Sequence, residues 1–350
     1  MQMNENNKLK KMELYLENAK NNGLPKDAYL QVGYSCNAKC IMCNIWKNPF
    51  IGDIDVLYSI INKLSELNFE WITFWGGEPL LHPLIDDLII FAKKKNLKVQ
   101  IITNGSLIKD HIDIICNLVD NLVVSIDSGL PEIHDKIRNT KGIYYQATEG
   151  IKELLKENKH PNIELDCTIL NENIDTLESI VELSNNLGKI FIDFDPVQIS
   201  GVGNNSKYEF QSNISGLFNA KKLAEDYGIE ITSKERMNLI EKYLKKEKIV
   251  MPCYSYCKDL LISPKGDVYA CWTIGDIIGN ILDDNFVQEW NNGLFNHKNI
   301  LTGHKKECYN CGFSHSRMPD KAYLKIVKKA NKIRLRNIKK QKKLLEKKPD

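Results

Sequence analysis

Strand-like and helix-like patterns of apolar and polar residues alternate from residue 28 to residue 194. The strand patterns cover residues 28–33, 71–75, 98–103, 122–126, 162–169 and 190–194. Helical patterns, with apolar residues three or four apart, lie between them at 54–67, 84–95, 109–118, 144–157 and 174–187. Because parallel strands need crossover helices, this alternation predicts an α/β fold, an open (β/α)6 partial TIM barrel.

The rest of the chain divides around this barrel. We expect a helical lead-in, the barrel, two bridging helices, a small C-terminal α+β module and a basic helical tail, at residues 1–27, 28–200, 201–250, 251–318 and 319–350. Within the small module, residues 260–271 read as strand, tight turn and strand. The glycines of loop 200–205 lack the third glycine and the helix opening of a dinucleotide fingerprint.

Three cysteines follow the first predicted strand. Cys36, Cys40 and Cys43 have the spacing C-x3-C-x2-C, which lets three thiolates reach one inorganic centre from one loop. Closed zinc sites favour four ligands, usually as separated pairs. A [4Fe–4S] cluster offers four iron corners, so three protein ligands leave one iron open for a group that is not protein. The spacing therefore favours an iron–sulfur cluster over zinc.

Other motifs lie at the ends of successive predicted strands, where barrel enzymes build their sites. They are Gly76-Gly77-Glu78-Pro79, Thr103-Asn104-Gly105, Ser125-Ile126-Asp127, the segment 134–142 and Thr168-Ile169-Leu170-Asn171. In this order, and together with the three cysteines, they resemble the radical SAM enzymes. The resemblance implies that the open iron chelates S-adenosylmethionine and that an electron from the cluster releases a 5′-deoxyadenosyl radical.

The same resemblance implies a set of cofactor-binding residues, namely Gly76, Gly77, Glu78, Asn104, Ser125, Asp127, Arg138 and Asn171. Glycine lets the backbone approach a ligand closely, and Glu78 can accept from the methionine ammonium. Ser125 and Asp127 are expected near the ribose and methionine end of the cofactor. Arg138 is expected to bind the methionine carboxylate and Asn171 to lie near the adenine. A solvated charge or a turn residue is the alternative for these last two.

A second set of cysteines lies in the small module: Cys253, Cys257, Cys271, Cys308 and Cys311. From Cys253 the spacing is C-x12-G-x4-C followed by C-x2-C, which resembles the SPASM/twitch extension of radical SAM enzymes. The resemblance implies one auxiliary [4Fe–4S] cluster, because no cysteine follows Cys311. Its expected ligands are Cys253, Cys271, Cys308 and Cys311, with structural zinc as the alternative. Cys257 is the spare thiol and a candidate hydrogen donor to a substrate radical, although it and Cys253 can exchange roles.

The composition and charge of the chain further restrict its class and its compartment. The chain has 350 residues, ten cysteines and no apolar stretch of about eighteen residues, so we expect no membrane span. Its polar start is not a secretory signal, and the cysteines then indicate metal chemistry in the cytoplasm. Residues 321–350 carry thirteen Lys or Arg against two acidic residues, whereas the whole chain has a net charge of +3, which leaves −8 elsewhere. A solvated helix is the expected state of this tail, and nucleic-acid binding is the weaker alternative.

The sequence therefore predicts a cytoplasmic radical SAM oxidoreductase that receives electrons from a donor such as flavodoxin or ferredoxin. We expect a small or carbohydrate-like substrate that is dehydrogenated or epimerised, because only 35 residues precede Cys36 and many peptide maturases carry a recognition domain there. A peptide maturase is the alternative. A zinc-stabilised nucleic-acid-binding protein is the alternative of another class. Trp272 stands where sulfatase-maturing members carry an aspartate base, so that activity is not expected.

Overall fold

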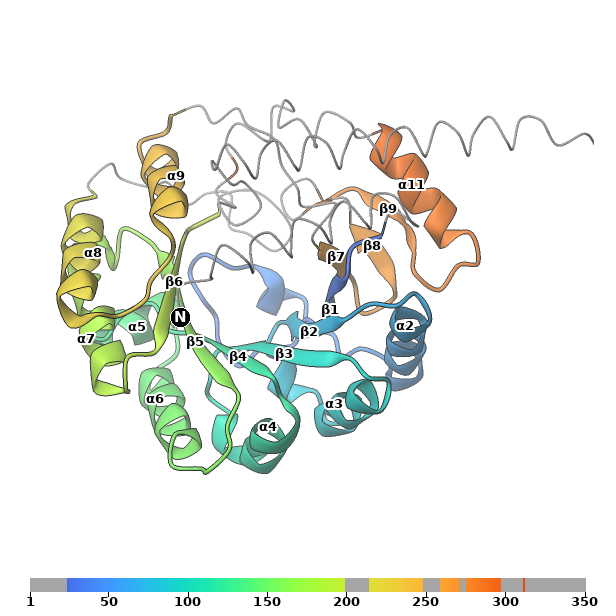
Figure 1. Cartoon of the computed structure of the whole chain (residues 1–350), viewed down its shortest axis with the longest axis horizontal. Helices are drawn as coiled ribbons and strands as arrows, with labels where there is room; N and C mark the ends of the chain where they lie inside the picture. The colour runs from blue at the N-terminus through green and yellow to red at the C-terminus, as the bar shows by residue number, and fades with distance from the viewer. Residues whose placement is uncertain are drawn as a thin grey trace, which may run out of the picture.

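The computed structural model describes residues 24–198, 214–247, 259–269, 271, 275–296 and 311. In this part of the chain the predicted barrel is present as an open parallel sheet with helices on its outer side (Figure 1). Its strands are β1 (Asp27–Gly33), β2 (Trp71–Gly76), β3 (Lys98–Thr103), β4 (Asn121–Ser125), β5 (Asn162–Ile169) and β6 (Phe191–Pro196). The sheet order β6-β5-β4-β3-β2-β1 confirms the predicted (β/α)6 partial barrel.

The crossover helices are α2 (Ile54–Glu66), α3 (Ile85–Lys94), α4 (Ile112–Leu118), α6 (Ile143–Leu154) and α7 (Glu178–Asn186). An additional helix, α5 (Pro131–Arg138), lies between β4 and α6 and was not predicted. Short 3-10 turns lie at η1 (Ile45–Lys47), η2 (Pro79–Leu81), η3 (Ile108–His111) and η4 (Ile174–Thr176). Beyond β6, α8 (Ser215–Tyr227) and α9 (Lys234–Leu244) agree with the two predicted bridging helices.

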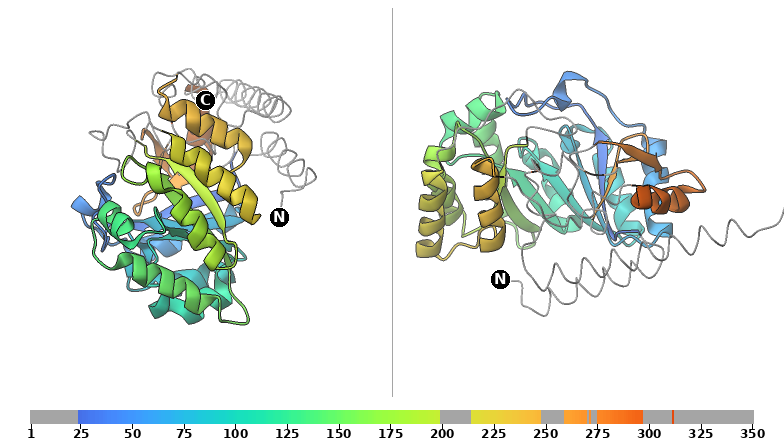
Figure 2. Two further views of the ribbon diagram at one scale, coloured as in Figure 1. Left: turned by 90° about the vertical axis from the view of Figure 1, so that its left-hand side faces the viewer. Right: turned by 90° about the horizontal axis from the view of Figure 1, so that it is seen from above.

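The predicted strand–turn–strand of the small module is present as β7 (Asp259–Ile262) and β8 (Asp267–Tyr269), followed by β9 (Ile277–Asn280) and α11 (Phe286–Asn296). These strands continue the barrel sheet, because β7 pairs in parallel with β1. As a result α8 and α9 lie beside one edge of the sheet and α11 beside the other (Figure 2). No helix in the described ranges is long and apolar enough to cross a membrane.

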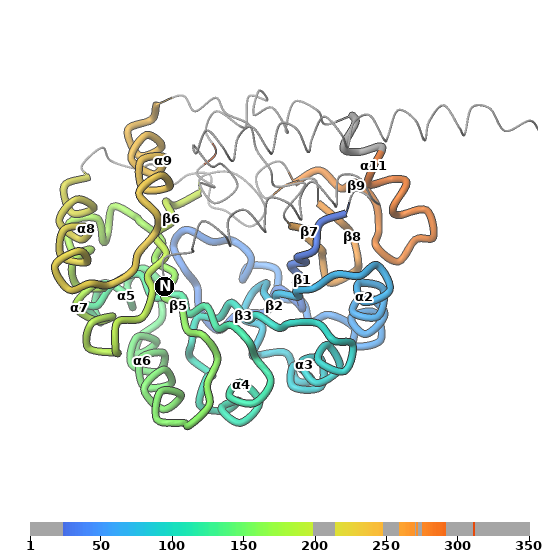
Figure 3. Tube along the Cα trace, viewed as in Figure 1, coloured from blue at the N-terminus to red at the C-terminus, as the bar shows by residue number. Residues whose placement is uncertain are grey.

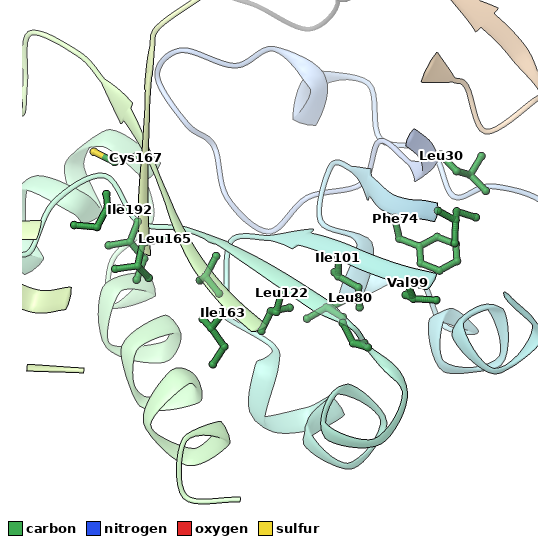
Figure 4. Packing of buried hydrophobic residues seen from close by; sticks show 14 of the residues in the cluster. Leu30, Phe74, Leu80, Val99, Ile101, Leu122, Ile163, Leu165, Cys167 and Ile192 are labelled. Atoms are coloured by element: carbon green, nitrogen blue, oxygen red, sulfur yellow. The ribbon is translucent and has the colours of Figure 1, made fainter. Parts of the chain in front are cut away.

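The core lies between the outer face of the sheet and its helices (Figure 4). Alternate strand residues such as Leu30, Phe74 and Ile101 are fully buried there. Each such side chain contributes about 1.5–3 kcal/mol when it leaves water. Two thiols also lie in this core: Cys167 is fully buried and Cys116 is 7% exposed.

The inner face of the sheet is polar in its lower half. The Gln100 amide donates to the Thr73 hydroxyl at 3.2 Å, and the Asn121 amide donates to Gln100 Oε1 at 2.6 Å and to Glu164 Oε1 at 3.2 Å. This row links the side chains of β2, β3, β4 and β5 below the ends where the predicted motifs lie.

Candidate active site at the carboxyl ends of the strands

The three predicted cluster cysteines share one cavity. Cys36, Cys40 and Cys43 line a space of about 160 Å³ at the carboxyl ends of β1 to β4. Five predicted cofactor-binding residues share its wall: Gly76, Gly77, Asn104, Ser125 and Arg138. The loop that carries the cysteines leaves β1 and crosses towards α5 (Figure 3). The structure therefore brings together motifs from four different strands, as a barrel active site requires.

The glycine pair lets the ends of β1 and β2 approach closely. Gly76 has a φ of +136°, and a Cβ there would clash with the carbonyl oxygen of Gly33. A Cβ on Gly77 would clash with the carbonyl oxygen of Ser35. Because both residues lack a side chain, the two backbones come close enough to form a hydrogen bond: Gly77 N donates to Gly33 O at 3.0 Å. The pair thus fixes the start of the cysteine loop as well as lining the cavity.

Asn37, the residue after Cys36, is held by the loop that follows β3. Its Oδ1 accepts from the Asn104 amide at 2.8 Å, and its amide donates to the Ser106 hydroxyl at 2.8 Å. Asn104 is itself positioned by Glu78, whose carboxylate accepts from Asn104 N at 2.7 Å. These contacts fasten one side of the cysteine loop to the sheet.

The other side of the cysteine loop is fastened to the end of α5. Lys39 N donates to Arg138 O at 3.1 Å, and Ile41 N donates to Ile137 O at 3.0 Å. These carbonyls belong to the last turn of α5, where they lack partners within the helix. Ile143, the first residue of α6, packs against Ala38 and Cys40. The unpredicted helix α5 is therefore a direct support of the predicted cluster loop.

The last residue of α5, Arg138, takes part in a buried ion pair. The Arg138 guanidinium donates two hydrogen bonds to the Asp127 carboxylate, at 2.7 and 2.9 Å, in the bidentate arrangement that Arg favours. The two side chains are 9% and 0% exposed. The third arm of the guanidinium, Nη1, lies 3.9 Å from Cys40 Sγ. His134 completes the group, because its Nδ1 accepts from Asp127 N at 3.1 Å.

Burial changes the protonation of the three thiols. It raises the pKa of Cys36 to about 12 and raises the pKa values of Cys40 and Cys43. The positive charge of Arg138 acts against this rise at Cys40. Without a metal the thiols are therefore protonated at neutral pH, and metal binding must release these protons.

The donor set fits an iron–sulfur cluster better than a zinc ion. The cavity wall contains three thiols and, within the described residues, no histidine or carboxylate. No three His, Cys, Asp or Glu side chains of the described ranges converge on a single ion. A tetrahedral zinc site needs such convergence, whereas a cube binds each thiolate at a separate iron.

Three other predicted cofactor-binding residues lie outside the cavity wall. The Glu78 carboxylate accepts from Leu80 N at 3.1 Å and from the Thr103 hydroxyl at 2.7 Å, in addition to its bond with Asn104. Asp127 is fully buried against Arg138. Asn171 is partly exposed at the end of β5. Thus Glu78 and Asp127 hold cavity residues in place.

Sequence reasoning missed Asn173, which is fully buried below the end of β5. Its amide donates to Asp127 O at 2.7 Å and to Thr168 O at 2.8 Å, and its Oδ1 accepts from Leu170 N. An asparagine that closes a strand is a common turn signal, so its type alone carried no sign of this role.

Only two members of the second cysteine set, Cys271 and Cys311, belong to the described residues, and both are partly exposed. Cys253, Cys257 and Cys308 lie outside the described residues, as do the lead-in up to residue 23 and the basic tail. The expected auxiliary cluster therefore stays a prediction from the sequence.

The inner wall formed by β5 and β6 is acidic. Asp166 is in register with Ser125 on one side and with Asp193 on the other, so the acidic wall begins beside the cavity. Arg236 of α9 binds Asp193 at 3.0 Å and Asp195 at 3.2 Å. Among the described residues the Asp166 carboxylate has no hydrogen-bond or ion-pair partner. Burial first, and then the charges of Asp195 and Asp193, raise the pKa of Asp166 well above its usual range.

Comparison with known proteins relates residues 30–184 to a known superfamily. Residues 30–184 match the Radical SAM superfamily. The chain is 23% identical over 286 residues to the antilisterial bacteriocin subtilosin biosynthesis protein AlbA of Bacillus subtilis, covering 77% of this chain and 60% of AlbA. It is 23% identical over 279 residues to the AdoMet-dependent heme synthase of Methanosarcina barkeri, covering 73% of this chain and 79% of that protein.

Solved structures show the same fold. Streptococcus suis SuiB bound to S-adenosylmethionine aligns with a TM-score of 0.60 at 14% identity, over 75% of this chain and 65% of SuiB. By the family match, residues 30–184 therefore form a radical SAM domain. Proteins of this superfamily use a [4Fe–4S] cluster and S-adenosylmethionine, and their SPASM members carry auxiliary clusters. The alternative of a zinc-stabilised nucleic-acid-binding protein finds no support in these relatives.

Proposed function

We propose that Cys36, Cys40 and Cys43 hold a [4Fe–4S] cluster and that S-adenosylmethionine binds in the adjoining cavity. The observation that carries this proposal is the single cavity that these thiols share with Asn104, Ser125 and Arg138. When bound, such a cluster supplies the electron that cleaves S-adenosylmethionine and yields the 5′-deoxyadenosyl radical. The oxygen sensitivity of the cluster suits the reducing cytoplasm, which we propose as the compartment.

The residues of the cavity wall would bind and orient the cofactor. Arg138 uses Nε and Nη2 for Asp127, which leaves its Nη1 side, next to Cys40, for the methionine carboxylate. The backbone at Gly76 and Gly77 would receive the methionine ammonium, because no side chain keeps the ligand away. Ser125 and Asn104 would contact the ribose end with their hydroxyl and amide groups.

The remaining predicted residues would act through these groups or beside them. Glu78 holds Asn104 N, and Asp127 holds the guanidinium of Arg138, so we assign both as positioning residues. Asn171 stays proposed as a contact of the adenine from the end of β5. Asn173 supports that strand end by bonding Thr168 O.

For the substrate we propose a peptide. The preference for a small or carbohydrate-like substrate rested on the short segment before Cys36, whereas several relatives carry names of peptide maturation: AlbA, the mycofactocin maturase MftC and the sporulation killing factor maturation protein SkfB. The chain spans 60% of AlbA's length, so AlbA's whole activity is not carried over. A non-peptide substrate is the second candidate, favoured by the similarity to AdoMet-dependent heme synthases.

The auxiliary cluster is proposed on the cysteine spacing, with Cys253, Cys271, Cys308 and Cys311 as ligands. Cys257 is proposed as the hydrogen donor of an epimerisation, whose test is turnover in deuterated water. Deuterium incorporation that is lost in Cys257→Ala would support the donor role. Oxidised product with unchanged activity in Cys257→Ala would exclude it.

The test of the proposed function is anaerobic cleavage of S-adenosylmethionine by protein reduced with dithionite. Wild type should form 5′-deoxyadenosine, and Cys40→Ala should not, because the cluster loses one of its three anchors. Cys116→Ala is the matched control, since Cys116 lies in the core away from the cavity. Cleavage that continues in Cys40→Ala at the wild-type rate would contradict the assignment.

A further inference from the structure

Each sulfur atom of the three predicted cluster cysteines faces an N–H donor. The sulfur atoms of Cys36 and Cys43 each accept from the backbone N–H of the second residue after them, at 3.4 Å in both cases. Cys40 Sγ instead lies 3.9 Å from Nη1 of the Arg138 guanidinium. Among the described residues, Arg138 is therefore the only charged donor to one of these sulfur atoms.

The positive charge of Arg138 is fixed in place from two sides. Its Nε and Nη2 donate to the Asp127 carboxylate at 2.7 and 2.9 Å, and the same carboxylate accepts from Thr168 N of β5 at 3.1 Å. The backbone carbonyl of Arg138 accepts from N of Lys39, the residue before Cys40, at 3.1 Å. The charged side chains of the pair are 9% and 0% exposed, so solvent ions screen their charges little.

The guanidinium lies between the carboxylate and the sulfur atom. Asp127 binds the edge formed by Nε and Nη2, whereas Nη1 faces Cys40. The positive end of the ion pair is therefore nearer to this sulfur atom than the negative end. Hydrogen bonds to the sulfur atoms and nearby charge are among the factors that set the reduction potential of an iron–sulfur cluster. A positive charge here favours the reduced, more negative cluster, and the carboxylate behind it weakens that effect.

We propose that the Asp127–Arg138 pair sets the reduction potential of the cluster at the three loop thiols, with Arg138 raising the potential and Asp127 limiting the rise. This role rests on the proposed function, which assigns the cluster to these thiols. In the step concerned, a low-potential one-electron reductant loses one electron and the cluster gains it, with no bond made or broken. Arg138 acts here through the sulfur atom of Cys40, separately from its proposed contact with the methionine carboxylate.

Lys39 offers a contrast on the same loop. Its side chain is exposed, although it directly precedes Cys40 in the sequence. Water and salt screen an exposed charge far more than a buried one, so Lys39 should contribute little to the potential. Counting charges near the loop would predict similar effects of the two residues, whereas burial and contact predict a large effect of Arg138 alone.

The experiment is a redox titration of the anaerobically reconstituted full chain, followed by electron paramagnetic resonance in the absence of S-adenosylmethionine. The signal of this cluster is the one that Cys36→Ala/Cys40→Ala/Cys43→Ala lacks, which separates it from an auxiliary cluster. At the wild-type midpoint potential, Arg138→Met should lower the ratio of reduced to oxidised cluster about tenfold, which corresponds to a midpoint about 59 mV more negative. Asp127→Asn should move the midpoint in the opposite direction, because the guanidinium then lacks its counter-charge.

The matched control is Lys39→Met, which removes the same charge from an exposed position and should change this ratio by less than about twofold. Because Arg138→Met leaves a buried carboxylate unpaired, iron and sulfide analysis checks that the variant has bound its cluster. Arg138→Lys keeps the positive charge, so its midpoint should lie between those of wild type and Arg138→Met.

A wild-type midpoint in cluster-loaded Arg138→Met, or an equal shift in Lys39→Met, would overturn the proposal. If Arg138→Met binds no cluster, Asp127→Asn decides: a more positive midpoint supports the role, and an unchanged or more negative midpoint excludes it. Absence from the wild type of any signal that the triple cysteine variant lacks would instead contradict the proposed function.

Discussion

The two inner walls of the open barrel differ in how completely their buried charged side chains are paired. On the cavity side, Asp127 and Arg138 form a matched pair, 0% and 9% exposed, with two hydrogen bonds. On the β5–β6 side, Asp193 and Asp195 share the guanidinium of Arg236, and Asp166 has no polar partner among the described residues. A matched pair in low dielectric fixes a geometry, whereas an unmatched carboxylate tends to stay protonated. The first wall therefore supports the cysteine loop, whereas the second contains a carboxyl group, Asp166, that resists ionisation.

Breaking the matched pair should have the largest effect on stability. Arg138→Leu leaves the Asp127 carboxylate buried without its charge partner, so we expect a loss of about 3–5 kcal/mol in the free energy of unfolding. Urea unfolding of the metal-free protein measures this loss. Combining it with Asp127→Asn should recover part of the stability, because no buried charge then remains. Strictly additive losses in the double variant would contradict the account of a coupled pair.

Removing the carboxylate that holds Asn104 should have the next largest effect. Glu78→Gln replaces one acceptor oxygen with an amide that cannot accept, which leaves either Asn104 N or the Thr103 hydroxyl and Leu80 N without a partner. We expect a loss of about 1–3 kcal/mol in the free energy of unfolding. Hydrogen exchange of residues 36–43 should also quicken, because Asn104 holds Asn37. Unchanged exchange of this loop would show that Glu78 does not act through Asn104.

On the β5–β6 wall, replacing a carboxylate by an amide should instead stabilise the protein. The pKa of Asp166 is raised in the fold, so the folded state binds more protons than the unfolded state and stability falls as pH rises above the ordinary carboxyl pKa. Asp166→Asn removes this penalty and should add about 1–2 kcal/mol at pH 8. The gain should vanish below about pH 4, where both states are protonated. A pH-independent gain would exclude the titration of Asp166 as its cause.

The smallest effect is expected at an exposed pair. Glu153 of α6 and Lys156, two residues beyond the end of that helix, lie 2.8 Å apart, yet both project into water. Solvent screens such pairs, so Lys156→Ala should leave the urea midpoint unchanged within error. A shift comparable with that of Arg138→Leu would show that burial is not what separates the two kinds of pair.

Periodicity in the sequence predicted the barrel well. Strands β3 and β5 have the predicted bounds, and the other four differ by one or two residues at one or both ends. Long apolar runs set these elements, because their buried faces must be apolar wherever they pack. Chemistry-bearing positions were predicted by resemblance, and five of the eight expected cofactor residues do line the cavity.

Helix α5 could not be predicted in the same way. It has only eight residues, begins with Pro131 and buries two polar side chains, His134 and Arg138, so little of its buried face is apolar. Its stability comes from contacts made after folding, such as the bond from Lys39 N to Arg138 O. The parallel pairing of β7 with β1 is likewise a tertiary choice that no local pattern encodes.

The most direct test of the central claim is the electron paramagnetic resonance spectrum of the reduced, anaerobically reconstituted protein with and without S-adenosylmethionine. The account predicts a [4Fe–4S]⁺ signal whose g values shift when S-adenosylmethionine binds the open iron. That shift should be absent in Cys36→Ala/Cys40→Ala/Cys43→Ala, where any signal that remains belongs to an auxiliary cluster. A wild-type signal that S-adenosylmethionine leaves unchanged, or a shift that persists in the triple variant, would contradict the claim that these three thiols hold the catalytic cluster.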